Sequence, residues 1–116
     1  MFPSNLELIN HIFEEVTFIL DSTVNKDKNT VINDQILSRA LIRSLEIIGE
    51  ASAKLDPEFK LLHGEIEWRK MTETRNRLIH NYFGVDYDLV WDIIISKLPD
   101  LRAHIRIIIG DSQEIQ

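Results

Sequence analysis

The chain has 116 residues, of which 44% are apolar and 28% are charged, a composition typical of a folded protein and not of a disordered one. This length predicts a single domain over residues 1–116. The absence of cysteine excludes disulfides and thiolate metal sites. No apolar run approaches the roughly 20 residues that span a bilayer, and the first residues lack a secretory signal, so we expect a cytoplasmic protein.

The net charge of −6 argues against non-specific nucleic-acid binding, because neutralising phosphates requires clustered Lys and Arg. The charges are unevenly distributed, however. Residues 69–77 contain one acid, Glu73, and four bases: Arg69, Lys70, Arg75 and Arg77. A local basic cluster on an acidic chain indicates a small phosphate-contacting site and not an extended nucleic-acid track.

Two amphipathic helices are predicted in the first half of the chain. The first covers residues 5–20, because Ser4 and Glu7 have the spacing of a capping box and apolar residues recur every three or four positions. The polar residues 21–29 are predicted to form a loop. The second helix should run from residue 33 or 34 to 55. It is apolar on more than one side, which predicts more than one neighbour, one of which could be another subunit.

A short helix and a long one follow. Asp56 and Pro57 predict the start of the short helix, since proline is tolerated in the first turn, and residues 63–64 should end it. The long helix is predicted over residues 68–82, with Gly84 as its stop.

Two more helices complete the predicted fold. Asp86 is the expected N-cap of the first, and the second should cover residues 98–109, with Gly110 closing it. Strand patterns are weak throughout, and no internal repeat is found. The predicted fold class is therefore all-α, an up-and-down bundle of four to five helices.

Residues 75–82, with the sequence RNRLIHNY, carry the most informative polar groups. At about 100° per residue, Asn76 and His80 share a face and Arg77 adjoins His80, whereas Arg75 and His80 flank a groove. Arginine suits phosphate because its planar guanidinium donates parallel hydrogen bonds and stays protonated. Histidine can take or give a proton near neutral pH. Asn76 can orient the imidazole or hold a phosphate oxygen.

Spacing alone leaves other interpretations open for this segment. An Arg-Asn pair and a histidine on a helix also fit ordinary surface or interface positions, and Tyr82 fits a core or helix-end aromatic residue. In the second predicted helix, Gly49 costs about 1 kcal/mol relative to alanine, which predicts close helix packing there. Glu46 and Glu50 fit either a salt bridge to the long helix or a solvated acidic face.

No cofactor or metal is predicted. The chain has no glycine-rich phosphate loop, and its other histidines, His11, His63 and His104, match no zinc spacing.

The pattern R-x-x-x-x-H-x-Y formed by Arg75, His80 and Tyr82 resembles the signature of the HEPN superfamily, specifically its HepT-like toxin branch. The likeness covers nearly the whole chain. It extends to three further segments: residues 40–51, residues 66–69, and residues 82–86 with Trp91. One departure is Glu67, where family members often carry proline, and another is residues 72–74. Neither touches the implied chemistry.

This resemblance implies a HEPN-like bundle that forms a homodimer, in which two motif helices meet across a cleft. It also implies a metal-independent endoribonuclease with Arg75 and His80 as the catalytic pair. His80 would deprotonate a ribose 2′-OH, and Arg75 would stabilise charge in the transition state. Asn76 and Arg77 would support the pair or orient the substrate. DNA lacks the 2′-OH and should resist cleavage.

The resemblance further implies a partner, a minimal nucleotidyltransferase that acts as antitoxin and transfers AMP onto Tyr82. This modification would place negative charge and bulk where RNA phosphate must lie. The alternative is a non-catalytic helical subunit that binds or regulates a nucleotidyltransferase, which the acidic net charge also suits.

Overall fold

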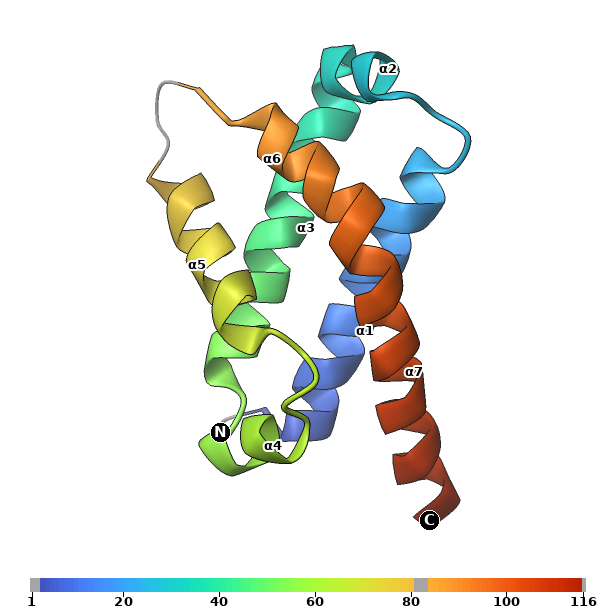
Figure 1. The fold of residues 1–116 in the computed structure, drawn as a ribbon, viewed down its shortest axis with the longest axis vertical. Coiled ribbons are helices and arrows are strands. Elements are labelled where there is room, and N and C mark those ends of the chain that lie inside the picture. Colours follow the sequence, from blue (N-terminus) through green and yellow to red (C-terminus); the bar gives the residue numbers. More distant parts are fainter. Residues whose placement is uncertain (1–2, 81–83, 116) are drawn as a thin grey trace.

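A computed structural model describes the backbone of residues 3–80 and 84–115 and the side chains of residues 3–80 and 84–110. All regular elements in these ranges are helices, so the predicted all-α class is confirmed (Figure 1). In chain order they are α1 (Asn5–Thr23), α2 (Lys28–Asn33), α3 (Gln35–Lys54), α4 (Pro57–Leu62), α5 (Trp68–Ile79), α6 (Tyr87–Asp92), the π-helical turn η1 (Ile93–Lys97) and α7 (Leu98–Ile115). Among these described segments, none combines the length and apolar character of a membrane-crossing helix.

The first helix begins where the capping pattern places it but ends later than predicted. Ser4 Oγ accepts a hydrogen bond from the Glu7 N–H at 3.1 Å. The helix continues to Thr23, whose buried hydroxyl donates to the Ile19 carbonyl at 2.8 Å. The six-residue α2 lies within the predicted loop, where Asp27 Oδ1 accepts from the Thr30 N–H at 2.8 Å. So short an element shows no apolar period in the sequence, which explains why it was not predicted.

The start of α3 agrees with the prediction because it depends on a local hydrogen bond. Asp34 Oδ1 accepts from the N–H groups of Ile36 and Leu37, at 3.1 and 2.9 Å, and so satisfies backbone donors of the first turn. As its apolar pattern predicted, α3 has more than one neighbour: it packs against α1, α2 and α5.

The helix predicted after Asp56 and Pro57 is confirmed as α4. Asp56 makes no side-chain cap of its own helix. Instead, its carboxylate accepts from Asn5 Nδ2 and its N–H donates to Asn5 Oδ1, both at 3.1 Å. This reciprocal pair ties the beginning of α1 to the beginning of α4.

The predicted separation between the last two helices is wrong, because α6, η1 and α7 follow one another without a break. Pro99 has no N–H, and its ring would crowd the carbonyl of Ile95 in an ordinary α-turn. The preceding turn is wider, and the Leu98 N–H donates to the Ile93 carbonyl five residues back. The predicted stop at Gly110 is also wrong: α7 passes through Gly110, which has no positive φ, and ends at Ile115.

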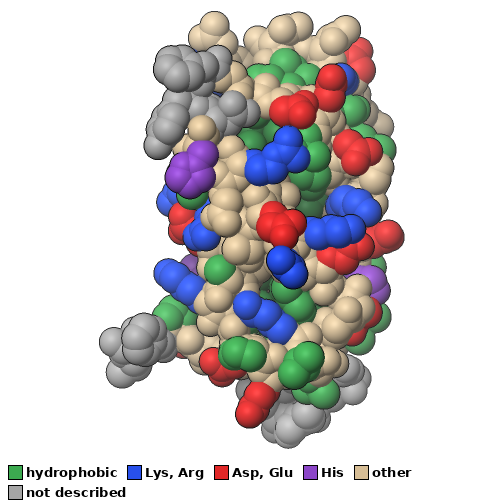
Figure 2. Space-filling model, turned by 60° about the vertical axis from the view of Figure 1, so that its left-hand side comes forward, with side chains coloured by type: hydrophobic (Ala, Val, Ile, Leu, Met, Phe, Trp, Pro, Cys, Tyr) green, Lys and Arg blue, Asp and Glu red, His purple; other side chains and the backbone are tan. Residues whose placement is uncertain are grey.

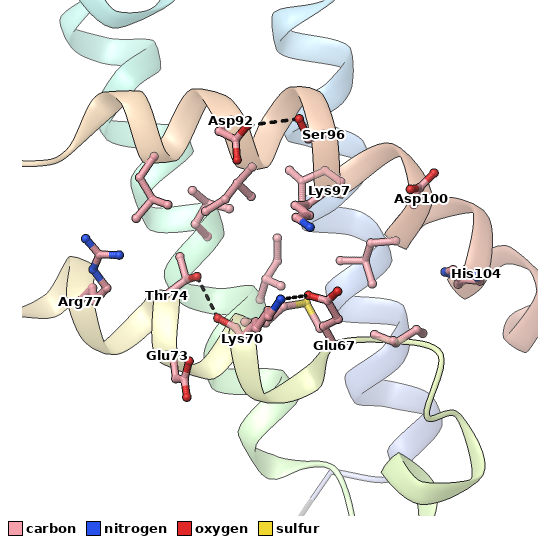
Figure 3. A pocket seen from close by; sticks show the side chains of 18 of the residues that line it. Glu67, Lys70, Glu73, Thr74, Arg77, Asp92, Ser96, Lys97, Asp100 and His104 are labelled. Atoms are coloured by element: carbon pink, nitrogen blue, oxygen red, sulfur yellow. Dashed lines mark hydrogen bonds and ion pairs between the residues drawn. The ribbon is translucent and has the colours of Figure 1, made fainter.

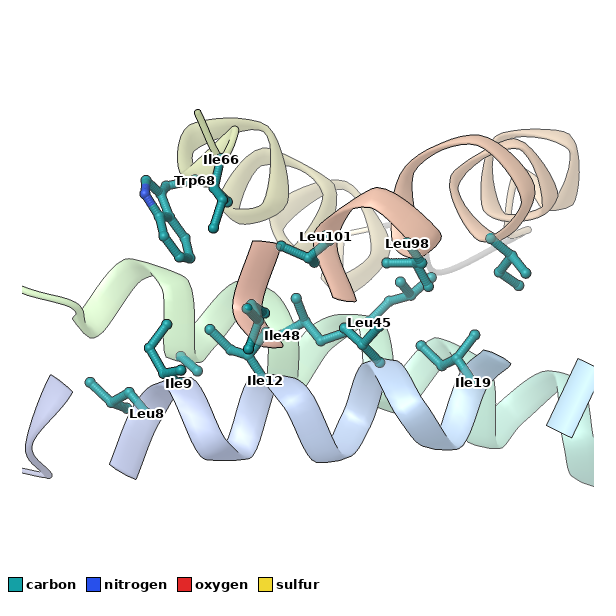
Figure 4. Close-up of a cluster of buried hydrophobic side chains, with 14 of the residues drawn as sticks. Leu8, Ile9, Ile12, Ile19, Leu45, Ile48, Ile66, Trp68, Leu98 and Leu101 are labelled. Atoms are coloured by element: carbon teal, nitrogen blue, oxygen red, sulfur yellow. The ribbon is translucent and has the colours of Figure 1, made fainter. Parts of the chain in front are cut away.

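The core lies between α1, α3 and α7 (Figure 4). Branched aliphatic side chains dominate it, and fully burying one of them stabilises the fold by about 1.5–3 kcal/mol. Its least exposed members are Ile9, Ile12, Val16, Ile19, Leu41, Ile48, Ile94 and Ile105. Helix α5 packs mainly on α3 and contributes Trp68 and Leu78 to the same buried cluster.

Candidate active site

The motif segment lies at the C-terminal end of α5. The prediction extended this helix to residue 82, but it ends at Ile79, and His80 is its C-cap, with an N–H that donates to the Asn76 carbonyl at 3.2 Å. His80 is exposed. Tyr82 lies outside the described residues.

Arg75 lies on the face of α5 that packs against α3. It shares this face with Met71, four positions before it, and with the buried Leu78, three positions after it. Gly49 of α3 lies directly opposite: a Cβ at residue 49 would be 2.3 Å from Arg75 Cβ and 2.7 Å from the Met71 carbonyl oxygen. The close packing predicted for Gly49 is therefore confirmed, and it positions the stem of Arg75.

The guanidinium of Arg75 is held by its sequence neighbour. Its Nε and Nη2 atoms donate to Asn76 Oδ1 at 3.1 and 2.8 Å. Arg75 is half-buried and Asn76 is exposed, so the charged end of the arginine reaches the surface while its stem lies between the helices. The side chain of Asn76 thus contacts the arginine of the predicted pair.

Arg77 lies on a different flank of α5. Successive residues of a helix are about 100° apart, so in a view along α5 Asn76 lies on one side of Arg75 and Arg77 lies on the other. Arg77 Nη2 is 3.9 Å from Asp86 Oδ2, which connects the end of α5 with the N-cap of α6. Both side chains are more than half exposed, so this ion pair contributes at most about 1 kcal/mol.

Within the described residues, Glu50 pairs with Arg43 of its own helix, at 3.8 Å between Nη1 and Oε1. This contact favours the acidic-surface interpretation of Glu50 over a salt bridge to α5.

A groove of about 440 Å³ lies beside α5 (Figure 3). It lies between α5 and the helical segment α6–η1–α7. Of the predicted site residues in the described ranges, Arg77 alone lines it. The groove and the Arg75–Asn76 contact therefore lie on different flanks of α5.

The sequence predicted close packing at Gly49 but not that Arg75 is its partner, and it did not predict the groove. The signal for the first was present, because Met71, Arg75 and Leu78 have the i, i+4, i+7 spacing of a buried stripe and thereby place an arginine against the next helix. The groove had no comparable signal, since it depends on the distance between helices that are far apart in the sequence.

Comparisons with known proteins agree with this fold and motif. Residues 12–108 match the sequence profile of the family described as ribonuclease HepT-like. "Putative RNase TTE0752" of Caldanaerobacter subterraneus is 36% identical over 98 residues, which cover 84% of this chain and 88% of that protein. "Probable ribonuclease HepT" of Thermococcus cleftensis is 38% identical over 100 residues, which cover 86% and 91%. No solved structure matches the chain.

The fold, the motif and these relatives define an all-helical ribonuclease of the HEPN type. The chain belongs to the ribonuclease HepT-like family. The sequence-based resemblance and the prediction of an endoribonuclease are confirmed at the level of the family.

Proposed function

We propose that this chain is a metal-independent endoribonuclease toxin that cleaves RNA by attack of a ribose 2′-OH on the adjacent phosphorus. The observation that carries the proposal is the Arg75 guanidinium held by Asn76 Oδ1 one turn before the exposed His80. Asn76 accepts from Nε and Nη2, so the remaining guanidinium N–H groups stay available for phosphate oxygens. Fixing the donor before substrate arrives avoids reorganisation during the reaction.

In the proposed reaction, His80 takes the proton from the 2′-OH as the O2′–P bond forms. Arg75 stabilises the charge that develops on the phosphorane oxygens. The P–O5′ bond then breaks, and the leaving O5′ takes a proton from a second imidazolium, the His80 of another subunit. The products are a 2′,3′-cyclic phosphate and a 5′-hydroxyl. Arg77, on the neighbouring flank, would bind a more distant phosphate of the same RNA.

A homodimer would supply the second histidine. In one chain, Asn76, Ile79 and His80 form an exposed face at the end of α5, and Ile79 is an apolar residue 38% exposed. A two-fold axis beside this face would cover Ile79 and bring two Arg75–His80 pairs to one cleft. Sedimentation equilibrium of the wild type should give the dimer mass. A monomer mass at the concentrations that support cleavage would contradict the shared cleft.

The catalytic proposal is tested by RNA cleavage in the presence and absence of EDTA. We expect His80→Ala and Arg75→Ala to lose cleavage, and the wild type to keep it in EDTA. The matched controls are His11→Ala, at an exposed histidine of α1, and Arg69→Ala, at an arginine of α5 whose side chain is 92% exposed. An RNA with 2′-deoxyribose at the cut position should remain intact.

Three results would reject parts of this mechanism. Equal cleavage by the wild type and both site variants would reject the catalytic pair. Loss of activity in EDTA would reject the metal-independent reaction. Intact RNA with all proteins would favour the alternative of a non-catalytic subunit, which the net charge of −6 supports.

We also propose that a minimal nucleotidyltransferase antitoxin inhibits the toxin by adding AMP to Tyr82. Tyr82 is two positions after His80, so a phosphodiester there would bring negative charge close to the phosphate-binding groups. Coexpression with the transferase should add AMP units to the wild-type mass and none to Tyr82→Phe. Modification of Tyr82→Phe to the same extent would contradict this assignment, and an unmodified wild type would contradict inhibition by AMP transfer.

A further inference from the structure

A groove lies on the flank of α5 away from the Arg75–Asn76 contact, because α5 and α7 pack on different helices and leave a space between them. α5 packs mainly on α3, while α7 packs on α1. Between them, Leu45 and Ile48 of α3 form an apolar floor, and Met71, Ile93 and Leu101 line the sides. Figure 2, turned to bring this side forward, shows hydrophobic surface between charged side chains. Leu45, Ile48 and Leu101 are nearly fully buried, so the apolar surface that remains accessible in the groove belongs to half-buried residues such as Met71 and Ile93.

The rim of the groove carries more acids than bases. Both acids and bases of the rim are partly paired: Lys70 Nζ is 3.0 Å from Glu67 Oε2, Glu73 pairs with Arg69, and Arg77 pairs with Asp86. The hydrogen bond and positive charge of Lys70 lower the pKa of Glu67. The lining acids are Glu65, Glu67, Glu73, Asp92 and Asp100, and the lining bases are Lys70, Arg77 and Lys97.

Among the described residues, Asp92 and Asp100 make no ion pair, and Asp92 accepts one hydrogen bond from Ser96 Oγ at 3.2 Å. Both carboxylates lie on the α6–η1–α7 side of the groove (Figure 3). On this side of the groove, opposite Arg77 of α5, the two carboxylates repel RNA phosphates. They attract Lys and Arg side chains.

The shape of the groove selects a helix as the occupant. The lining residues of α5 extend from Lys70 to Arg77, about two turns or roughly 11 Å, and Glu65 to Glu67 lengthen this side. Apart from residues 65–67, both sides are helices, whose backbone groups are paired within the helix, so they offer few partners to an extended strand. A helix satisfies its own backbone and can place apolar side chains every three or four residues into such a groove.

We propose that this groove is a docking site for a basic amphipathic helix of a partner protein, with apolar side chains between Met71 and Ile93 and flanking Lys or Arg side chains on Asp92 and Asp100. The site is separate from the Arg75–His80 pair, and the proposal does not depend on catalysis.

The test uses two synthetic helical peptides of about 15 residues. Both carry Leu at every third or fourth position, and their flanking positions are Lys in one peptide and Glu in the other. The chain has two methionines, Met1 and Met71, so selective ¹³C-methyl labelling gives a direct reporter inside the groove. We expect the Lys peptide to bind and to shift the Met71 methyl signal, and the Glu peptide to leave it unchanged.

Paired variants locate the binding. Ile93→Glu, at a half-buried position in the groove, should weaken binding of the Lys peptide by about tenfold or more. Its control is Ile95→Glu in the same turn, at a side chain 58% exposed and outside the groove.

The double variant Asp92→Lys with Asp100→Lys should also weaken binding, whereas Glu14→Lys with Glu58→Lys, the same charge change at exposed positions of α1 and α4, should not. If circular dichroism shows that Ile93→Glu does not fold, the comparison of these two double variants tests the proposal, because all four substituted positions are exposed.

Four outcomes would overturn the proposal. The first two are no binding of the Lys peptide up to about 1 mM, a weak affinity, and equal binding of both peptides. The third is binding of the Lys peptide that leaves the Met71 methyl signal unchanged, or that has the same affinity for the groove variants as for the wild type. The fourth is a lower sedimentation mass of peptide-free Ile93→Glu but not of Ile95→Glu, which would show that a second copy of this chain covers the groove.

Discussion

The crossing of α3 and α5 at Gly49 gives the sharpest prediction, the effect of Gly49→Ala. The added Cβ would lie 2.3 Å from Arg75 Cβ, where carbon atoms normally approach to about 3.5–4.0 Å. It would also lie 2.7 Å from the Met71 carbonyl oxygen, a backbone atom that no rotamer change can move. The two helices must therefore separate by about 1 Å or more.

The cost of this separation has two opposing contributions. Overpacking a well-packed contact costs about 1–3 kcal/mol. Replacing glycine by alanine inside a helix stabilises the helix by about 1 kcal/mol. Because a backbone atom has to move, the overpacking term should lie near its upper end, and we expect a net loss of about 1–2 kcal/mol. For a chain of this size, each kcal/mol lowers Tm by about 4 °C.

The assay is thermal unfolding of the wild type, Gly49→Ala and Gly110→Ala. Gly110 lies in α7, and a Cβ there would meet nothing within 4 Å, so the same substitution should be neutral or slightly stabilising. RNA cleavage by Gly49→Ala should also fall, by up to about 100-fold, because the stem of Arg75 shifts with the helix. An unchanged or higher Tm for Gly49→Ala would refute the packing argument, and a lower Tm with full activity would refute the link to Arg75.

Three further predictions concern single contacts. Asn76→Ala should reduce RNA cleavage by about tenfold or more with little change in Tm, since a hydrogen bond to a charged group contributes about 1.5–3 kcal/mol; full activity would contradict the clamp. In urea unfolding, Ile105→Ala should cost about 2–5 kcal/mol, because this side chain is 0% exposed, and Ile107→Ala, 61% exposed, should stay within about 0.5 kcal/mol. Similar losses for both would contradict the assigned core. Asp34→Ala should cost about 1 kcal/mol in the same assay, and an unchanged midpoint would argue against its cap of α3.

Helix starts were predictable from the sequence because they depend on contacts between near neighbours. Ser4, Asp34 and Asp86 each accept a hydrogen bond from a backbone N–H two or three residues on, so a short stretch of sequence contains all the partners involved. The apolar period likewise predicted α1 and α3, since one stripe of side chains faces the core in each.

Helix ends and breaks were less predictable because distant contacts and backbone adjustment decide them. Pro99 indicates the start of a helix in the sequence, but the wider π-helical turn η1 before it allows the helix to continue without a break. Gly110 reads as a stop, yet α7 continues, since nothing there requires a positive φ. At the site, the contact of Arg75 with Asn76 joins adjacent residues, which do not normally face each other on a helix, and it forms because the long arginine side chain bends back along the surface.

The proposed catalytic residues occupy parts of α5 with very different expected rates of local unfolding. The amide of Arg75 lies inside α5, where the helix packs closely against Gly49 of α3. Hydrogen exchange at this amide therefore requires α5 to separate locally from α3. The amide of His80 lies in the last turn, where helices fray first. The guanidinium would thus act as a rigid anchor for an incoming phosphate, and the imidazole would adjust around it.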